Sequence, residues 1–134
     1  MRMEVNNLSP DEIVIMETLW NHENIGFNAI LQYAEQEGGY LNRNTLLGHL
    51  ESLCAKDMIR VSREEKILLN NTTIKQYSAI CTREEYLAAV LENNPIFDES
   101  IFPGILASIM KNISSQETIN KSLRTIEQEK KRRK

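Results

Sequence analysis

Apolar side chains recur every three or four residues along most of this 134-residue chain, which is the spacing of an amphipathic helix. Only a short section in the middle alternates between apolar and polar residues, as a strand does. The spacing predicts helices at about 9–20, 26–37, 42–56, 82–92, 101–113 and 114–126. The pattern therefore predicts a mainly α-helical protein with one small β-hairpin.

The first predicted helix has strong start signals. Ser9 can cap it, Pro10 suits the first helical position, and Glu12 completes a Ser-x-x-Glu capping box. Leu8 and Ile13 are spaced for a hydrophobic staple. The apolar positions expected to be buried in the first two helices are Ile13, Met16, Leu19, Trp20, Ile30, Leu31 and Ala34. We expect Gly38-Gly39 to end the second helix.

The third predicted helix begins at Asn42–Asn44 and ends at Lys56-Asp57, where Asp can adopt the left-handed conformation. The side expected to be buried carries Leu46, Leu50, Leu53 and Cys54, with Leu47 at its edge and His49 as a partly buried flank. The opposite side carries Asn44, Thr45, Gly48, Glu51, Ser52 and Ala55. One side of this helix is thus free to meet a partner.

Two strand-like runs, Ile59–Ser62 and Ile74–Ile80, follow the third helix, with turn-forming residues at 70–73 between them. Ile67-Leu68-Leu69 either extends the first strand or forms an exposed apolar loop. A capped helix, a turn and a hairpin in this order are what a winged helix-turn-helix needs. We therefore expect a winged-helix domain at 1–81, with a recognition helix at about 43–56 and a wing at about 59–80.

The remaining residues, 82–134, are expected to form a helical dimerisation region. Thr82 and Glu85 form a second capping box, and Ser114 and Glu117 a third. Pro103 fits a helix only within its first turn. The residues expected at the dimer contact are Tyr86, Leu87, Phe102, Ile105, Leu106, Ile109, Met110, Ile119, Leu123 and Ile126. An apolar surface of this kind needs a symmetric partner, or else one larger core shared with the winged domain.

Charge and composition exclude several classes of function. The net charge of −3 hides an acidic stretch at 1–38 and a mildly basic middle, which is compatible with phosphate binding by one face. No apolar run is long enough to cross a membrane, and no secretory signal is visible, so we expect a cytoplasmic protein. Cys54 and Cys81 are read as free thiols. No catalytic constellation, metal-ligand spacing or cofactor motif is present, which argues against an enzyme.

Three parts of the sequence together resemble the penicillinase-repressor family of bacterial regulators. They are the opening segments Leu8–Glu12 and Met16–Trp20, the positions Thr45, Leu46, Leu50, Leu53, Lys56, Met58 and Ile59, and the run Tyr77–Leu87. That family includes the methicillin-resistance and copper-transport repressors. The resemblance extends from about Leu8 to Ile126. It implies a homodimeric repressor that binds an inverted-repeat operator in double-stranded DNA, and a membrane sensor-protease as a further partner.

Three departures from the family pattern stand out. The family often has basic or polar residues at the positions of Leu47, Gly48 and Ser52, so the recognition helix is poor in long hydrogen-bond donors. No cysteine cluster is found near the C-terminus, which argues against copper sensing by the family's route. Ser108-Ile109 stands where the family's cleaved Asn-Phe bond is expected, which argues against induction by the same proteolysis.

The residues expected to contact DNA lie on the recognition helix and the wing: Arg43, Asn44, Thr45, Gly48, Ser52, Arg63, Lys66 and Lys75. Arginine suits guanine, asparagine suits adenine, and the threonine methyl group suits thymine. Cations of the wing would bind phosphates without reading sequence. The basic run Lys130–Lys134 complements the helix dipole and adds nonspecific DNA affinity. The alternative function is a winged-helix protein-interaction module that has lost specific DNA recognition.

Overall fold

The computed structural model describes residues 8–36 and 41–133, and it divides the chain into two compact units with the boundary after Asn93. The first unit contains the helices and strands between residues 10 and 92, and the second contains the helices between residues 99 and 132. Helix α4 (Arg83–Glu92) is therefore grouped with the first unit. A functional boundary at 81/82 stays a prediction. The expected break at Gly38-Gly39 lies outside the described residues.

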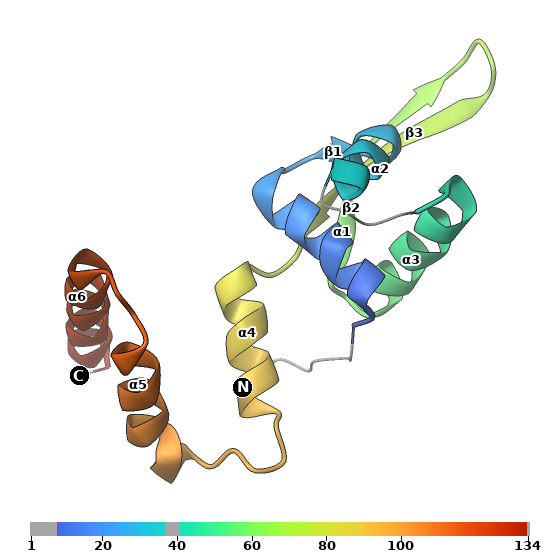
Figure 1. The fold of residues 1–134 in the computed structure, drawn as a ribbon. Coiled ribbons are helices and arrows are strands. Elements are labelled where there is room, and N and C mark those ends of the chain that lie inside the picture. Colours follow the sequence, from blue (N-terminus) through green and yellow to red (C-terminus); the bar gives the residue numbers. More distant parts are fainter. Residues whose placement is uncertain (1–7, 37–40, 134) are drawn as a thin grey trace. The chain divides into compact units, whose positions relative to one another are not determined.

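The start of α1 (Pro10–Asn21) forms as the sequence predicts. Ser9 accepts a hydrogen bond from the Glu12 N–H, the Glu12 carboxylate accepts one from the Ser9 N–H, and Pro10 lies in the first turn. A two-residue strand that the sequence did not indicate, β1 (Ile25–Gly26), connects α1 to α2 (Phe27–Gln36). Figure 1 shows α1, α2 and α3 gathered on the sheet.

Helix α3 (Arg43–Ala55) is capped by Asn42, whose side chain accepts a hydrogen bond from the Thr45 N–H at 2.8 Å. It ends at Lys56, and Asp57 then adopts the left-handed conformation with φ 58°, as expected for the turn into the hairpin. Leu46, Leu50 and Leu53 are buried, which confirms the inward side of the helix.

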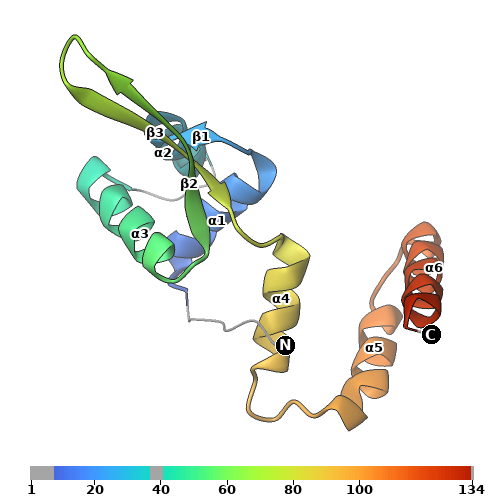
Figure 2. The same ribbon diagram turned by 180° about the vertical axis from the view of Figure 1, so that it is seen from behind.

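The wing is a long antiparallel hairpin of β2 (Ile59–Ile67) and β3 (Thr72–Ala79), and the sheet order is β1-β3-β2. Figure 2, seen from behind, shows the hairpin extending well past the helices. An irregularity between Val61 and Arg63 leaves Ser62 out of register, and its hydroxyl donates to the Gln76 carbonyl oxygen at 3.3 Å. Such a bulge bends a strand and increases its twist.

The core of the first unit lies where α1, α2, α3 and the sheet meet. Its fully buried side chains include Ile15, Met16, Leu19, Ile30, Leu46, Leu50, Leu53 and Ile59. Two sequence expectations for α1 were wrong in detail. Ile13 is 42% exposed, although it was expected to be buried. Ile15 is completely buried, although it was not among the positions expected to be buried. The core therefore takes a slightly different side of α1, because contacts with three partners decide which residues face inward.

Helix α4 begins with the predicted Thr82–Glu85 capping box, and Trp20 from α1 donates its ring N–H to the Cys81 carbonyl oxygen at 2.9 Å. Tyr86 is half-buried, and its ring centroid lies 5.6 Å from that of Trp20. Leu87, an expected dimer contact, is 59% exposed, and Val90 is 40% exposed. Within Arg83–Glu92, all of which the structure describes, Ala89 is the one buried residue.

The second unit consists of η1 (Glu99–Ile101), α5 (Phe102–Lys111) and α6 (Gln116–Arg132). Pro103 lies in the first turn of α5, as predicted. The expected capping box at Ser114 was wrong by one residue. Ser115 is the cap and accepts from the Thr118 N–H at 3.2 Å, because α6 starts at Gln116. Among the described residues, no helix is both long enough and apolar enough to span a membrane.

Candidate nucleic-acid interface

The exposed side of α3 is the natural candidate for DNA contact, because a single helix with one free side fits the major groove. Besides Arg43, the structure leaves six residues of this helix exposed: Asn44, Thr45, Leu47, Gly48, Glu51 and Ala55. Leu47, expected at the edge of the buried side, is 47% exposed, so it belongs to this surface. Gly48 has no heavy atom within 4 Å of where a Cβ would lie, so a larger side chain would fit there in the free protein.

Asn44 is available for base contact, because Asn42 and not Asn44 caps the helix. The structure assigns the cap side chain to Asn42, and Thr45 takes part through its backbone N–H alone. The Asn44 amide and the Thr45 methyl and hydroxyl groups are therefore exposed on the first turn of α3, the turn whose residues contact base edges in helix-turn-helix proteins.

Arg43 is held against α2. Its guanidinium donates to the Asn28 side-chain oxygen at 2.8 Å, and its Cζ lies 4.9 Å from the centre of the Phe27 ring. Both contacts are at the protein surface. From the sequence pattern, Arg43 is expected to contact guanine, and that role stays a prediction. In this structure one guanidinium nitrogen, Nη1, is engaged by Asn28.

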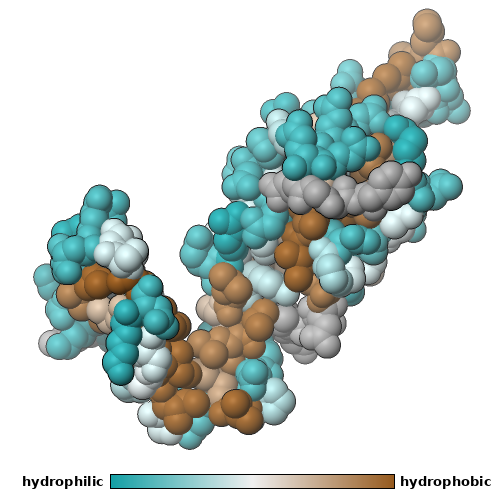
Figure 3. Space-filling view, viewed as in Figure 1, coloured by the Kyte–Doolittle hydropathy of each residue, from teal (hydrophilic) through white to brown (hydrophobic). Residues whose placement is uncertain are grey.

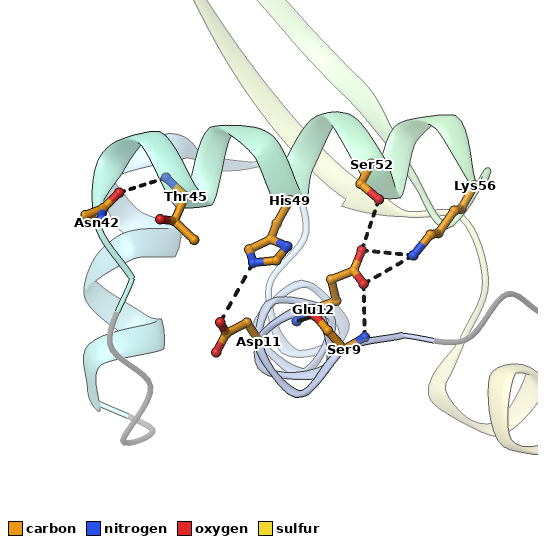
Figure 4. A network of polar contacts seen from close by, with 8 residues as sticks. All are labelled: Ser9, Asp11, Glu12, Asn42, Thr45, His49, Ser52 and Lys56. Carbon is orange, nitrogen blue, oxygen red and sulfur yellow. Dashed lines mark hydrogen bonds and ion pairs between the residues drawn. The ribbon is translucent and has the colours of Figure 1, made fainter.

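Ser52 points to α1 and not to the exposed side of α3. Its hydroxyl donates to the Glu12 carboxylate at 3.2 Å, and the ammonium group of Lys56 lies 3.2 Å from both oxygens of the same carboxylate (Figure 4). The Glu12 side chain is 6% exposed and that of Lys56 is 25% exposed. Ser52 as a DNA contact stays a prediction, but this geometry does not favour it.

The Glu12 carboxylate thus has two functions: it completes the cap of α1, and it anchors the last turn of α3. Burial raises the pKa of Glu12, but hydrogen bonds and the charge of Lys56 outweigh burial, and the pKa lies below its ordinary value. Earlier on α3, the His49 ring nitrogen lies 3.8 Å from the Asp11 carboxylate. Polar contacts with one short segment of α1 therefore add to the buried leucines in holding α3 in place.

The three cations of the wing that the sequence predicts to contact DNA do not share one face. In the register of the hairpin, Lys75 pairs with Glu64 and Lys66 with Thr73, so Lys66 and Lys75 lie on the same face. Arg63 pairs with Gln76 on the opposite face. All three cations are exposed. A phosphate backbone that runs along one side of the hairpin would meet Lys66 and Lys75 together, and Arg63 would meet a different part of the DNA.

The residues expected at the dimer contact are arranged differently in the two units. In the first, Leu87 is exposed and Tyr86 packs against Trp20. In the second, none of the residues 94–133 is buried. Its large apolar side chains at or above 41% exposure are Ile96, Ile101, Phe102, Ile109, Leu123 and Ile126, while Ile105, Leu106, Met110 and Ile119 are half-buried. The second unit has an apolar surface without a core of its own.

Both cysteines are free, Cys54 half-buried and Cys81 buried. Burial raises the pKa of both thiols, and the Glu85 charge adds to the effect at Cys81. Little thiolate forms at neutral pH as a result, so neither cysteine has the properties of a reactive thiol. Within residues 8–36 and 41–133, no group of three or more His, Cys, Asp or Glu side chains is placed to hold a metal ion.

A capped helix with one exposed side, followed by a long cationic hairpin, defines a winged-helix DNA-binding protein. The family model "Penicillinase repressor" matches residues 8–129. The chain therefore belongs to the penicillinase-repressor family, and it is a DNA-binding transcriptional regulator. This agrees with the resemblance noted in the sequence.

Comparison with solved structures gives weaker likenesses. A complex structure of hsRosR-SG is 16% identical, with a TM-score of 0.48, and covers 92% of this chain and 93% of that chain. A MepR mutant from a multidrug-resistant S. aureus clinical isolate is 14% identical, with a TM-score of 0.47, and the match covers 91% of this chain and 78% of that chain. Likenesses this weak identify neither a ligand nor a partner. No curated protein gives a significant match.

Proposed function

We propose that the protein is a dimeric repressor that blocks transcription by occupying an inverted-repeat operator in double-stranded DNA. The observation that carries the proposal is the first turn of α3, where Asn44 and Thr45 are exposed on a helix with a separate residue as its cap. In this arrangement α3 lies in the major groove and the wing lies along the backbone. The family's regulators act on DNA in the cell, so the site of action is the cytoplasm.

The side chains on α3 suggest what kind of sequence is read. Asn44 can pair with adenine through two hydrogen bonds, and the methyl groups of Thr45 and Leu47 can pack on a thymine methyl group. Glu51 can accept a hydrogen bond from cytosine. With Arg43 held by α2, no long donor is presented to guanine on this helix surface. A half-site rich in A·T pairs therefore suits this helix best.

Dimerisation is supported by the second unit. Ile101, Phe102 and Ile109 are each about half exposed on η1 and α5, and Leu123 and Ile126 are similarly exposed on α6. A pair of helices without a buried residue gains too little from burial to offset the conformational entropy lost when it folds. A second copy of the same helices can cover these exposed side chains. Two-fold symmetry also matches an inverted repeat.

A membrane sensor-protease as a partner has only the family resemblance in its favour. The Ser108-Ile109 bond lies inside α5, and Asn112 donates to the Ser108 carbonyl oxygen at 3.2 Å. A protease would have to unwind this turn before cutting. The inducing signal is better sought through the genes that neighbour this one.

The test is a fluorescence-anisotropy titration of the full chain against duplexes from its own upstream promoter, with a random duplex of equal length as the control. We expect saturable binding to a promoter segment, and two-fold symmetric protection of that segment from nuclease. The alternative function, a winged-helix module that acts through protein contacts, is favoured by Leu47 and Glu51 on the helix surface and by the bound state of Arg43. Equal affinity for both duplexes would support that alternative and overturn the repressor.

A further inference from the structure

The wing ends in two leucines with almost no protein contact. Leu68 is 87% exposed and Leu69 is 99% exposed, so both are open to solvent in the described structure. Figure 3 shows this apolar end as the brown tip of the hairpin. Single exposed apolar side chains are common on soluble proteins. Two adjacent ones at the end of a long hairpin form a shape that fits into a narrow groove.

The turn beyond these leucines is ordered by its own hydrogen bonds. Asn71 adopts the left-handed conformation with φ 53°. The Asn70 side-chain oxygen accepts from the Thr72 N–H at 3.2 Å, and the Asn70 carbonyl oxygen accepts from the Thr72 hydroxyl at 3.4 Å. These contacts close the hairpin and keep its end narrow. The leucine pair is therefore presented on a preformed support, which lowers the entropy cost of inserting it.

Close to the tip, the isoleucines and the lysines of the hairpin lie on opposite faces, while Arg63, further from the tip, shares the face of the isoleucines. Ile67 and Ile74 lie on one face of the hairpin, and Ile74 is 45% exposed. Lys66 and Lys75 lie on the other face. A DNA groove has the matching arrangement, with phosphates at its rim and the sugars and base edges further in. Only the narrow apolar end of such a hairpin can enter the minor groove, which is about 6 Å wide, and the lysines set back from this end would meet the phosphates at the rim.

We propose that Leu68 and Leu69 enter the minor groove beside the major-groove contact of α3, and that they wedge open a base step and bend the operator. This inference rests on the proposed function, because it places the wing on operator DNA. Leucine is one of the side chains that minor-groove proteins insert between base pairs, with kinks of about 20–90°. The bent step should be a pyrimidine–purine step, because such steps unstack most easily.

The experiment compares the wild-type chain with Leu68→Thr/Leu69→Thr. Both side chains are exposed, so the double variant should fold as the wild type does, which circular dichroism checks. Ile80→Thr is the matched control, because Ile80 is 52% exposed and lies just after β3, at the end of the hairpin away from the tip. Bending is measured by energy transfer between dyes at the two ends of the operator duplex. Base unstacking is measured by 2-aminopurine fluorescence at the proposed step.

We expect wild type and Ile80→Thr to bend the duplex and to raise the 2-aminopurine signal. The double variant should bind on the order of tenfold more weakly and leave the duplex straight. Its salt dependence should be unchanged, because Lys66 and Lys75 are retained.

The outcomes separate this inference from the proposed function. If wild type binds random and operator duplexes equally, the proposed function fails and the inference fails with it. If wild type prefers the operator but does not bend it, or if the double variant bends it equally, only the inference is overturned. If the double variant binds and bends DNA normally but loses self-association in sedimentation, the tip is a protein contact, and the inference is again overturned.

Discussion

The Glu12 carboxylate links the start of α1 to the end of α3, and replacing it by glutamine tests whether this link orients the recognition helix. The glutamine side chain would keep an oxygen that can accept from the Ser9 N–H, because glutamine also serves in a capping box. It would lose the negative charge that faces Lys56. It would also replace the second oxygen, which accepts from the Ser52 hydroxyl, by an NH2 group, so the substitution removes the contacts with α3 and leaves the cap of α1 in place.

The expected loss in the free energy of unfolding depends on how deeply the Glu12–Lys56 ion pair is buried. Removing one partner of a fully buried ion pair costs about 3–5 kcal/mol. Here the Lys56 side chain is 25% exposed and can turn partly to solvent. We therefore expect Glu12→Gln to lower the free energy of unfolding by about 2 kcal/mol. The assay is urea unfolding, with reductant present and at one fixed protein concentration, since a dimer's stability depends on concentration.

The matched control is Glu17→Gln. Glu17 pairs with Arg83, but both side chains are more exposed, at 34% and 43%. A surface pair of this kind contributes about 0–1 kcal/mol. We expect this variant to unfold close to the wild-type midpoint, although it too loses one carboxylate from the first unit. A control that lost as much stability as Glu12→Gln would show that net charge, and not the buried contact, is responsible.

The pH dependence gives a second test with a definite sign. The pKa of Glu12 is lowered in the folded protein, so its charge stabilises the fold at pH values above the ordinary carboxyl pKa. That stabilisation is lost as the pH falls through the lower, folded value. The difference between wild type and Glu12→Gln should therefore shrink on acidification below about pH 4.5. A difference that stayed constant down to the acid transition would refute the electrostatic argument.

Three further predictions concern the DNA and dimer contacts. Ile105→Asp with Ile109→Asp should give monomers by light scattering, because two charges would have to be buried between copies; an intact dimer would place the interface elsewhere. Asn44→Ala should weaken operator binding by about 1–3 kcal/mol by anisotropy and leave random-duplex binding unchanged; equal losses on both duplexes would remove Asn44 from base reading. Lys66→Gln with Lys75→Gln should lower the slope of log affinity against log salt by about 2, with little loss of sequence preference; an unchanged slope would mean that neither lysine contacts phosphate.

Local signals in the sequence predicted local structure well. The Ser9–Glu12 and Thr82–Glu85 capping boxes and the position of Pro103 all appear as expected, because each depends on residues within one helical turn. The left-handed turn at Asp57 is correct for the same reason. The order of helices and hairpin followed from these boundaries, and it was enough to predict the winged-helix fold.

The candidate site was harder to predict, because its side chains are placed by contacts between distant segments. Ser52 lies on the side of α3 that periodicity assigns to solvent, yet its hydroxyl meets Glu12, 40 positions away in the sequence. Leu47 shows the reverse case and is exposed. The rotation of α3 about its axis depends on how α1 docks, and no short-range pattern encodes this. For Ile67-Leu68-Leu69, the sequence allowed either a longer first strand or an exposed apolar loop. Ile67 ends the strand and Leu68 starts the turn, so each alternative was partly right.

The position of Arg43 connects these observations to specificity. Its hydrogen bond to Asn28 and its contact with Phe27 are both at the surface, so together they are worth about 1–2 kcal/mol. A bidentate contact to guanine is worth about 1–3 kcal/mol of discrimination. The two ranges overlap, so Arg43 would leave α2 only for a well-placed guanine. We therefore expect Arg43→Ala to weaken binding by less than about 1 kcal/mol on an operator without guanine next to α3. A large loss on such an operator would mean that the α2 contact itself holds α3 in its binding position.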